Sequence, residues 1–231
     1  MNSEMGFKAN GSRSMPRIFR TYPLRFILFL TLIFQGLQVC AQQPGQDDYA
    51  IYSCIIKKEI SDTIQSICFL KNGIAGKEVN EYTQNLVLAL RSGNHNSMQH
   101  LYSWTESDYG ERPTTIDTVM HQYILDFCSY PSNAFELSEK FEIPCKAIML
   151  DRYPIKASTS HEDWNRFYKK FPGSGGIFAF SRIIYYQENH STAIVYFWHR
   201  RYDLNGHGAL AILKKQKEGW KIQYKTYLWW N

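Results

Sequence analysis

The sequence lacks the short motifs by which many enzymes and metal proteins are recognised. It contains no Cys-x-x-Cys pair, which excludes a zinc ribbon and a thioredoxin-like redox site. His161-Glu162 is not followed by a second histidine four residues later, so the zinc-protease motif is absent. No serine stands in a Gly-x-Ser-x-Gly nucleophile elbow. Internal repeats and low-complexity tracts are also missing, and aromatic residues make up 16% of the chain, which argues against disorder.

An apolar run long enough to span a membrane is also absent. The longest run, Phe26–Phe34, is far shorter than the ~20 residues that a transmembrane helix needs. Arg17, Arg20 and Arg25 precede this run, and Val39-Cys40-Ala41 follows it with residues that suit a signal-peptidase site. The pattern predicts a secretory leader.

The leader sets the predicted domain boundaries. We expect translation from Met15, cleavage after Ala41, a short linker over 42–47 and a single domain over 48–231 in a secreted or periplasmic protein. No transmembrane span is expected after cleavage. The alternative is a membrane-anchored lipoprotein held through Cys40, although the residue before it is larger than such signals prefer.

Positive charge is scarce outside the leader. The chain has 26 Lys and Arg against 21 Asp and Glu, a net charge of +5. Residues 1–41 hold five of the basic residues and one acidic residue, so the predicted mature protein carries only about +1. The charge therefore gives no support for binding to nucleic acid.

Hydrophobic spacing predicts helices and short strands in the first two thirds of the chain. Isoleucines from Ile51 to Ile60 share one face of a helix that Asp47 or Asp48 would cap. Further elements are expected over 64–70 (strand), 79–90 (helix), 114–127 (helix), 134–141 (a helical turn) and 145–150 (strand).

The last third predicts one helix and four strands. Aromatic residues from Trp164 to Phe171 form a helical stripe that Pro172-Gly173 ends. Four runs rich in β-branched and aromatic residues follow, separated by short turns, over 177–186, 192–199, 209–213 and 220–230. We predict an α+β fold: N-terminal helices packed on a C-terminal four-stranded antiparallel meander, with one or two additional strands.

The final strand shows the clearest period of two. Alternate residues from Trp220 to Trp230 are apolar or suited to a core, which predicts one buried face. The same alternation places Lys221, Gln223 and Lys225 on the solvent face.

Three stretches carry a likeness to other proteins. They are YAIYSCII at 49–56, WNRFYKKFP with GSGGIFAFSR at 164–182, and AIVYF, GHGALAILKK and GW between 193 and 220. This pattern resembles a family of uncharacterised secreted bacterial proteins, several of them lipoproteins. Members often carry a repeated Cys-Gly pair where this chain has His199–Gly208, which contains no cysteine. The resemblance implies the fold and export, and it implies no activity.

Four cysteines remain after the predicted cleavage, an even number that permits two disulfides. They are Cys54, Cys68, Cys128 and Cys145. Each lies in an apolar run, so buried free thiols explain them equally well, and a domain of this size does not need disulfides to fold.

Polar residues gather at the predicted turn between the second and third C-terminal strands: His199, Arg200, Arg201, Asp203 and His207. If these strands pair across 203–206, His199 and His207 face each other. Two imidazoles with Asp203 could hold a divalent metal, or His199 and Asp203 could act as a base and its orienting group. A solvated turn with a charged rim explains the same residues without any function.

Ser181 and Arg182 interrupt an otherwise apolar strand. They could line a pocket in which Arg182 receives a carboxylate or a phosphate. Strand alternation would equally place Arg182 on the solvent face. The glycine-rich segment 173–176 follows a helix and does not precede one, so turn geometry explains it better than phosphate binding.

These observations favour an exported, non-enzymatic binding or interaction domain. We expect no cofactor and no nucleic acid, and a partner that is a protein or small molecule of the cell envelope. The candidate binding residues are Ser181, Arg182, His199, Arg201, Asp203 and His207. The alternative is a small metal-dependent or His/Asp hydrolase with its site at the 199–207 hairpin, where His199 and His207 are the candidate metal ligands.

Overall fold

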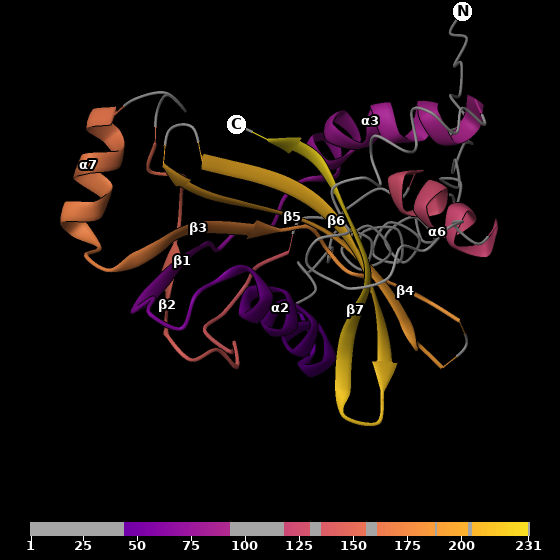
Figure 1. The fold of residues 1–231 in the computed structure, drawn as a ribbon, viewed down its shortest axis with the longest axis horizontal. Coiled ribbons are helices and arrows are strands. Elements are labelled where there is room, and N and C mark those ends of the chain that lie inside the picture. The colour runs from indigo at the N-terminus through magenta and orange to yellow at the C-terminus, as the bar shows by residue number, and fades with distance from the viewer. Residues whose placement is uncertain are drawn as a thin grey trace, which may run out of the picture. The chain divides into compact units, whose positions relative to one another are not determined.

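A mixed seven-stranded sheet organises the protein (Figure 1). The computed structural model describes residues 44–92, 118–129, 135–155, 161–187, 189–202 and 205–230, all within the compact unit Ala41–Asn231. The strands are β1 (Ser66–Leu70), β2 (Lys146–Leu150), β3 (Ser174–Phe180), β4 (Ile184–Tyr186), β5 (Thr192–Tyr202), β6 (Asn205–Gln216) and β7 (Gly219–Trp230). Six of them lie in the order β2-β1-β3-β5-β6-β7, and β4 pairs separately with β5.

Helices cover both faces of this sheet. They are α2 (Gln46–Glu59), α3 (Gly76–Ser92), α6 (Thr118–Ser129) and α7 (His161–Lys170). The predicted α+β class with a strand-rich C-terminal part is therefore confirmed. Among the described ranges, no helix combines the length and the apolar character needed to cross a membrane.

The predicted four-stranded meander is only partly right. Strands β5, β6 and β7 are consecutive antiparallel neighbours. The expected strand over 177–186 is broken into β3 and β4, which both pair with β5. The break follows from Ser181, whose Oγ accepts the Tyr196 N–H at 2.9 Å where a strand carbonyl would otherwise accept it. The two additional strands, β1 and β2, run parallel to each other, and β1 also runs parallel to β3, so the sheet is mixed.

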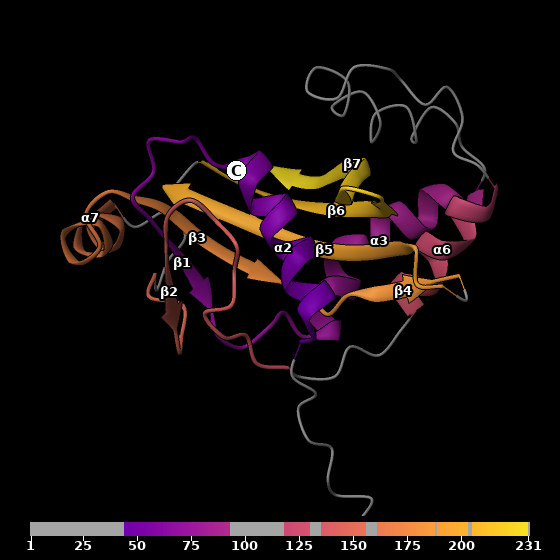
Figure 2. The same cartoon turned by 90° about the horizontal axis from the view of Figure 1, so that it is seen from below.

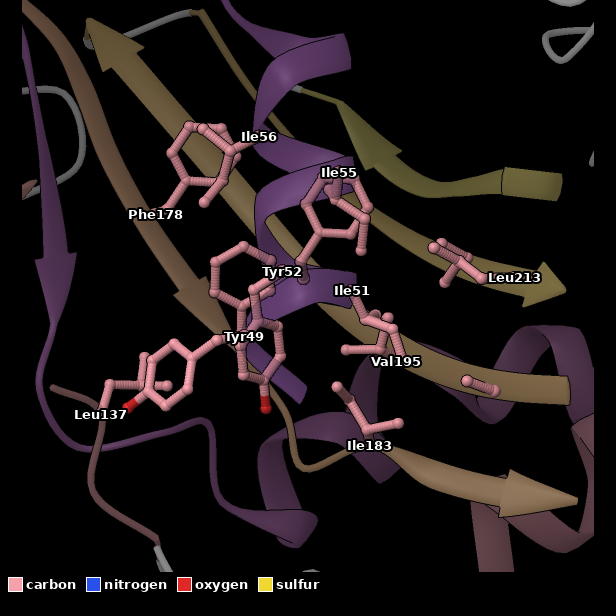
Figure 3. Packing of buried hydrophobic residues seen from close by; sticks show 14 of the residues in the cluster. Tyr49, Ile51, Tyr52, Ile55, Ile56, Leu137, Phe178, Ile183, Val195 and Leu213 are labelled. Atoms are coloured by element: carbon pink, nitrogen blue, oxygen red, sulfur yellow. The ribbon is translucent and has the colours of Figure 1, made fainter. Parts of the chain in front are cut away.

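Alternate residues of the central strands face two separate cores. On β3, Phe178 and Phe180 pack with α2, whereas Ile177 and Ala179 pack with residues of α3, α6 and α7. Figure 2 shows α2 lying across one face of the sheet with α3 on the other side. Figure 3 shows side chains of α2 directed into the first core. The fold thus has three layers, with the sheet buried on both faces.

Helix α2 forms where the isoleucine spacing predicts it, but its cap differs from the expected one. Gly45 is the N-cap, and Asp48 stands three residues later, where its Oδ2 accepts the Gly45 N–H at 2.8 Å. Asp48 therefore acts as the N3 residue of a capping box, whose side chain accepts the N–H of the N-cap residue. The isoleucines Ile51, Ile55 and Ile56 are fully buried.

Residues 135–141 form no helical turn, contrary to the prediction. Phe135 and Leu137, two residues apart, are both buried in the α2 core, and Glu136 forms an isolated bridge to Asn72. A spacing of two places side chains on one face only in extended chain. The predicted caps of the last two helices, at 114–115 and 160, lie outside the described residues.

Strand β7 departs from strict alternation at two irregularities. Its pairing with β6 shifts between Ile212 and Leu213 and again between Gly208 and Ala209. An extra residue in one strand moves every following side chain to the opposite face. Lys225, predicted on the solvent face, consequently turns toward α2 and is only 3% exposed.

Candidate functional site

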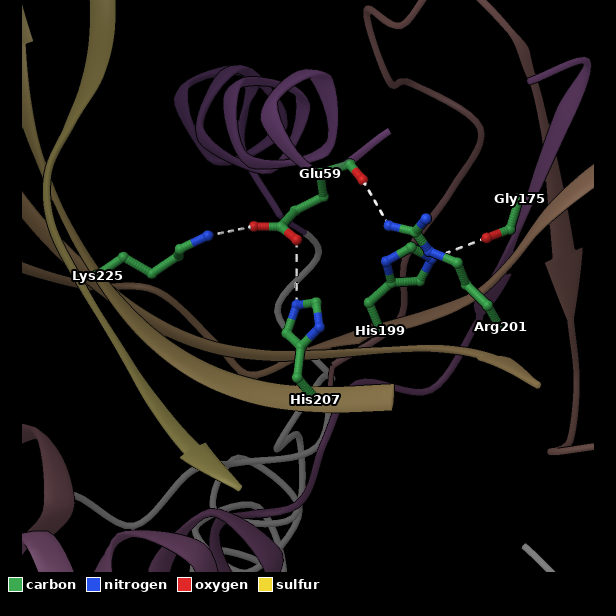
Figure 4. Close-up of polar contacts among 6 residues, drawn as sticks. All are labelled: Glu59, Gly175, His199, Arg201, His207 and Lys225. Atoms are coloured by element: carbon green, nitrogen blue, oxygen red, sulfur yellow. Dashed lines mark hydrogen bonds and ion pairs between the residues drawn. The ribbon is translucent and has the colours of Figure 1, made fainter. Parts of the chain in front are cut away.

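His199 and His207 lie directly opposite each other on β5 and β6, as the hairpin pairing predicts. Their ring centroids are 5.8 Å apart, and both side chains are buried. Glu59, the last residue of α2, is also buried and reaches over the two rings (Figure 4). One carboxylate oxygen and one nitrogen of each imidazole lie within 4.8 Å of one another. Three elements thus bring three metal-ligating side chains to one point.

Lys225 completes this buried cluster, named below the Glu59 cluster after its central residue. Its Nζ lies 2.7 Å from Glu59 Oε1 and 4.5 Å from the centre of the Tyr227 ring. His207 Nε2 lies 3.1 Å from Glu59 Oε2, close enough for an ion pair, although the contact is not aligned as a hydrogen bond. The carboxylate therefore uses one oxygen for Lys225 and turns the other toward His207.

Burial and charge act in opposite directions on Glu59 and Lys225. Burial alone would raise the pKa of the Glu59 carboxyl, but the contacts with His207 and Lys225 outweigh it and lower that pKa to about 2. Burial alone would lower the pKa of Lys225, but the Glu59 charge and hydrogen bond raise it above its ordinary value. Both residues are charged at neutral pH.

His199 is held as a neutral ring in one tautomer. Burial lowers its pKa to about 3, against the raising effect of the Gly175 carbonyl. Its Nε2 lies 2.8 Å from Gly175 O, and because a carbonyl can only accept, Nε2 carries the hydrogen. The Nδ1 atom then presents a lone pair, and it is buried without a hydrogen-bond partner. Figure 4 shows this nitrogen on the side of the ring that faces Glu59.

The other residues predicted at this hairpin do not join the cluster through described contacts. The Arg201 Nη2 donates to the Glu59 carbonyl at 3.0 Å, which satisfies an acceptor at the end of α2. Asp203 lies outside the described residues. Burial of both imidazoles leaves little room for a substrate, which weakens the hydrolase alternative.

Arg182 lines a cavity of about 550 Å³ at the beginning of α2. The wall joins residues from the start of α2, from the segment before β2, from β4 and from the connections on either side of β4. Besides Arg182 it includes Pro44, Gly45, Gln46, Asp47, Asp48, Tyr52, Phe135, Tyr185 and His190. We call this the Arg182 cavity, and it accords with the pocket that the Ser181-Arg182 interruption suggests.

The carboxylates of the Arg182 cavity differ in how firmly they are held. Asp48 accepts from the Tyr185 hydroxyl at 2.5 Å and from the Gly45 N–H at 2.8 Å. Asp47 instead forms an ion pair with Lys215 at 2.8 Å in which both side chains are about half exposed. Exposed ion pairs of this kind contribute about 0–1 kcal/mol, so Asp47 is the carboxylate that a ligand can recruit.

Aromatic rings form the apolar part of the same wall. Tyr185 stacks on His190 with centroids 5.4 Å apart. Burial, with the Asp48 carboxylate, raises the pKa of Tyr185 far above its ordinary value, so its hydroxyl stays protonated. Tyr52 and Phe135 are buried beside it. The cavity therefore combines both signs of charge with flat apolar surfaces.

Ser181 and the glycine-rich segment have structural explanations. Ser181 is 1% exposed, and its hydroxyl links to β5 and to the Arg182 carbonyl. Gly173 and Gly176 have φ of 70° and 108°, and a Cβ at Gly176 would lie 2.3 Å from the Arg200 carbonyl oxygen. Turn geometry and close packing of β3 on β5 account for this segment.

The four cysteines of the described chain are free thiols: Cys54, Cys68, Cys128 and Cys145. Burial raises the pKa of Cys68 to about 11, which keeps it protonated and unreactive. Cys68 and Cys128 are buried, whereas Cys54 and Cys145 are half-buried, so the interpretation as buried small residues fits only the first two.

The sequence reading missed Glu59 and Lys225. Glu59 follows Ile55 and Ile56 at helical spacing, so its position on the buried stripe was available as a signal. Lys225 carried no such signal, because the irregularities of β7 decide its face.

Comparisons with protein-family models, with curated proteins and with solved structures found no match.

Proposed function

We propose that the protein is an exported, non-enzymatic binding domain whose ligand is a small organic molecule with a carboxylate and an ammonium group. The observation that carries this proposal is the Arg182 cavity, which sets a guanidinium and a recruitable carboxylate in one wall. Arg182 can bind a carboxylate through two parallel N–H donors. Asp47 can accept from an ammonium group in place of Lys215.

The remainder of the wall supports binding over catalysis. Tyr185 keeps its proton, and the two oxygens of Asp48 are engaged by the Tyr185 hydroxyl and the Gly45 N–H, so neither side chain is free to attack a substrate. The stacked rings of Tyr185 and His190 offer a flat surface for an apolar ligand body. A few fixed polar groups within an apolar wall are typical of small-molecule sites.

Export rests on the leader pattern of residues 15–41. A mass spectrum of protein from its native host tests it directly. We expect a chain beginning at Gln42. A lipidated chain beginning at Cys40 would instead indicate the lipoprotein alternative, and an uncleaved chain would contradict export through this leader.

Calorimetric titration with three related probes tests the ligand class. L-Phenylalanine carries both charges, whereas 3-phenylpropionate lacks the ammonium and 2-phenylethylamine lacks the carboxylate. Because a hydrogen bond to a charged group contributes about 1.5–3 kcal/mol, we expect L-phenylalanine to bind at least about tenfold more tightly than either analogue.

Two variants locate that preference. Arg182→Gln should remove the advantage over 2-phenylethylamine, and Asp47→Asn the advantage over 3-phenylpropionate. Lys221→Gln, which changes an exposed cation on β7 paired with Glu218, is the matched control and should bind as the unmodified protein does. The proposal fails if no probe binds saturably, or if Arg182→Gln binds L-phenylalanine unchanged.

A further inference from the structure

We propose that Glu59, His199 and His207 form a site for one divalent transition-metal ion of the zinc and cobalt class. This site is separate from the Arg182 cavity and does not depend on the proposed ligand.

The three donor atoms lie nearly as close together as the ligands of a bound metal ion do. They lie within 4.8 Å of one another. A tetrahedral ion with bonds of about 2.0–2.2 Å needs donors roughly 3.4 Å apart, so small side-chain rotations suffice. Two imidazoles and one carboxylate suit zinc and cobalt, whereas calcium and magnesium prefer sites made of oxygen alone.

An independent observation comes from the imidazole nitrogens that face the carboxylate. His199 Nδ1 is buried without a hydrogen-bond partner, and the buried His207 Nε2 has only its contact with Glu59 Oε2 at 3.1 Å. Buried polar atoms nearly always have one, and an ion between them would satisfy both. The His199 lone pair is the stronger case, since the hydrogen bond to Gly175 fixes the tautomer that leaves Nδ1 free to coordinate.

The surrounding contacts also resemble those around known metal ligands. A ligating histidine usually donates its other N–H to a carbonyl or carboxylate, as His199 does to Gly175 O. A ligating carboxylate is usually hydrogen-bonded through its second oxygen, as Glu59 Oε1 is to Lys225. Because all four side chains are buried, the ion would tie α2 to β5 and β6 and would not meet a substrate.

Lys225 opposes the ion. Its ammonium neutralises Glu59 and repels a second cation a few ångströms away. A metal site therefore predicts that removing this charge strengthens metal binding. An ion-pair network that holds no metal predicts instead that nothing binds in either form.

The experiment uses the full chain, purified with a chelator and dialysed free of it. Zinc is titrated calorimetrically, and cobalt is followed by its visible absorption bands. We expect one ion per chain, and binding at least about tenfold tighter in Lys225→Met. His207→Gln should bind at least about 100-fold more weakly, since even outer-shell changes cost 10–100-fold. His121→Ala, on α6, is the matched histidine control and should bind like the unmodified chain.

A variant could lose zinc because it misfolds or because it lacks a metal-ligating side chain. The double variant Glu59→Gln/Lys225→Met distinguishes these two causes. It removes both buried charges together, and its circular dichroism should match that of the unmodified chain while zinc binding is lost. The inference is overturned if neither the unmodified chain nor Lys225→Met binds one ion, if Lys225→Met binds no more tightly, or if His121→Ala weakens binding as much as His207→Gln. None of these outcomes affects the Arg182 cavity, whose probes contain no metal.

Discussion

Replacing Lys225 with methionine tests the electrostatic description of the Glu59 cluster in the absence of metal. Methionine has a similar length and apolar character but carries no charge. The change leaves Glu59 buried and charged with only His207 beside it, because Lys225 supplies the ammonium on Oε1 at 2.7 Å. A buried charge without its partner is strongly destabilising.

The expected magnitude follows from the carboxyl itself. A group whose pKa falls from 4.5 to about 2 favours its charged form by about 3 kcal/mol more than it does in water, and His207 and Lys225 together produce this shift. Breaking one partner of a buried ion pair costs about 3–5 kcal/mol in other proteins. We therefore expect Lys225→Met to lower the free energy of unfolding by about 3 kcal/mol. The double variant Glu59→Gln/Lys225→Met should recover most of this, since it leaves no unpaired charge.

Urea unfolding followed by tryptophan fluorescence, with a chelator present, measures these differences. Lys221→Met is the matched control on the same strand, because Lys221 forms an exposed pair with Glu218 and should lose less than about 1 kcal/mol. The reasoning is refuted if Lys225→Met is no less stable than Lys221→Met, or if the double variant is as unstable as the single one.

Three other predictions concern pH, packing and thiols. Burial holds the pKa of His199 near 3, below its ordinary 6.5. Between these values the unfolded chain binds a proton at this residue and the folded chain does not. The contribution of His199 to folding stability, fully present above pH 6.5, is therefore lost as the pH falls. The free energy of unfolding should drop by about 2 kcal/mol from pH 7 to pH 5 in the presence of a chelator. Glu59, His207 and Arg201 face the ring. The His199→Gln variant should lack this drop, and an equal drop in the variant and the unmodified protein would contradict the prediction. Gly208→Ala places a Cβ 2.1 Å from Trp229 Nε1 and should cost about 1–3 kcal/mol in urea unfolding, whereas Gly45→Ala, with its nearest atom at 4.0 Å, should cost much less. The buried thiols should react with a thiol reagent only after unfolding, and a disulfide-linked native mass would contradict the free state.

Much of the fold was predictable because its elements follow local periodicity. The isoleucines of α2 and the runs that became β1, β2, β5 and β6 appear in the sequence with the correct type. The break at Ser181 could not be predicted, since it depends on a hydroxyl accepting from a residue of another strand. Likewise, period two in β7 placed Lys225 on the wrong face, because the irregularities arise from pairing with β6.

The candidate sites show the same limit. His199 and His207 could be placed together from hairpin pairing alone, whereas for Arg182 the sequence left two alternatives, a pocket and the solvent face. Their partners could not. Glu59 comes from a helix far away in sequence, and the Arg182 cavity is closed by the start of that same helix. The spacing of residues along the sequence does not predict such contacts between distant segments.

The parallel pairing of β1 has a consequence for the newly made chain. Both neighbours of β1 are synthesised long after it, one beginning at Lys146 and the other at Ser174, and the α2 core needs Trp220 as well. A nascent chain cannot complete the sheet around β1 or the α2 core until its last strands emerge, because these contacts join segments far apart in sequence. We expect ribosome-stalled chains that end before Gly219 to remain protease-sensitive. Such a chain stays largely unfolded until translation is nearly complete, which is the state that the proposed export through a membrane channel would require.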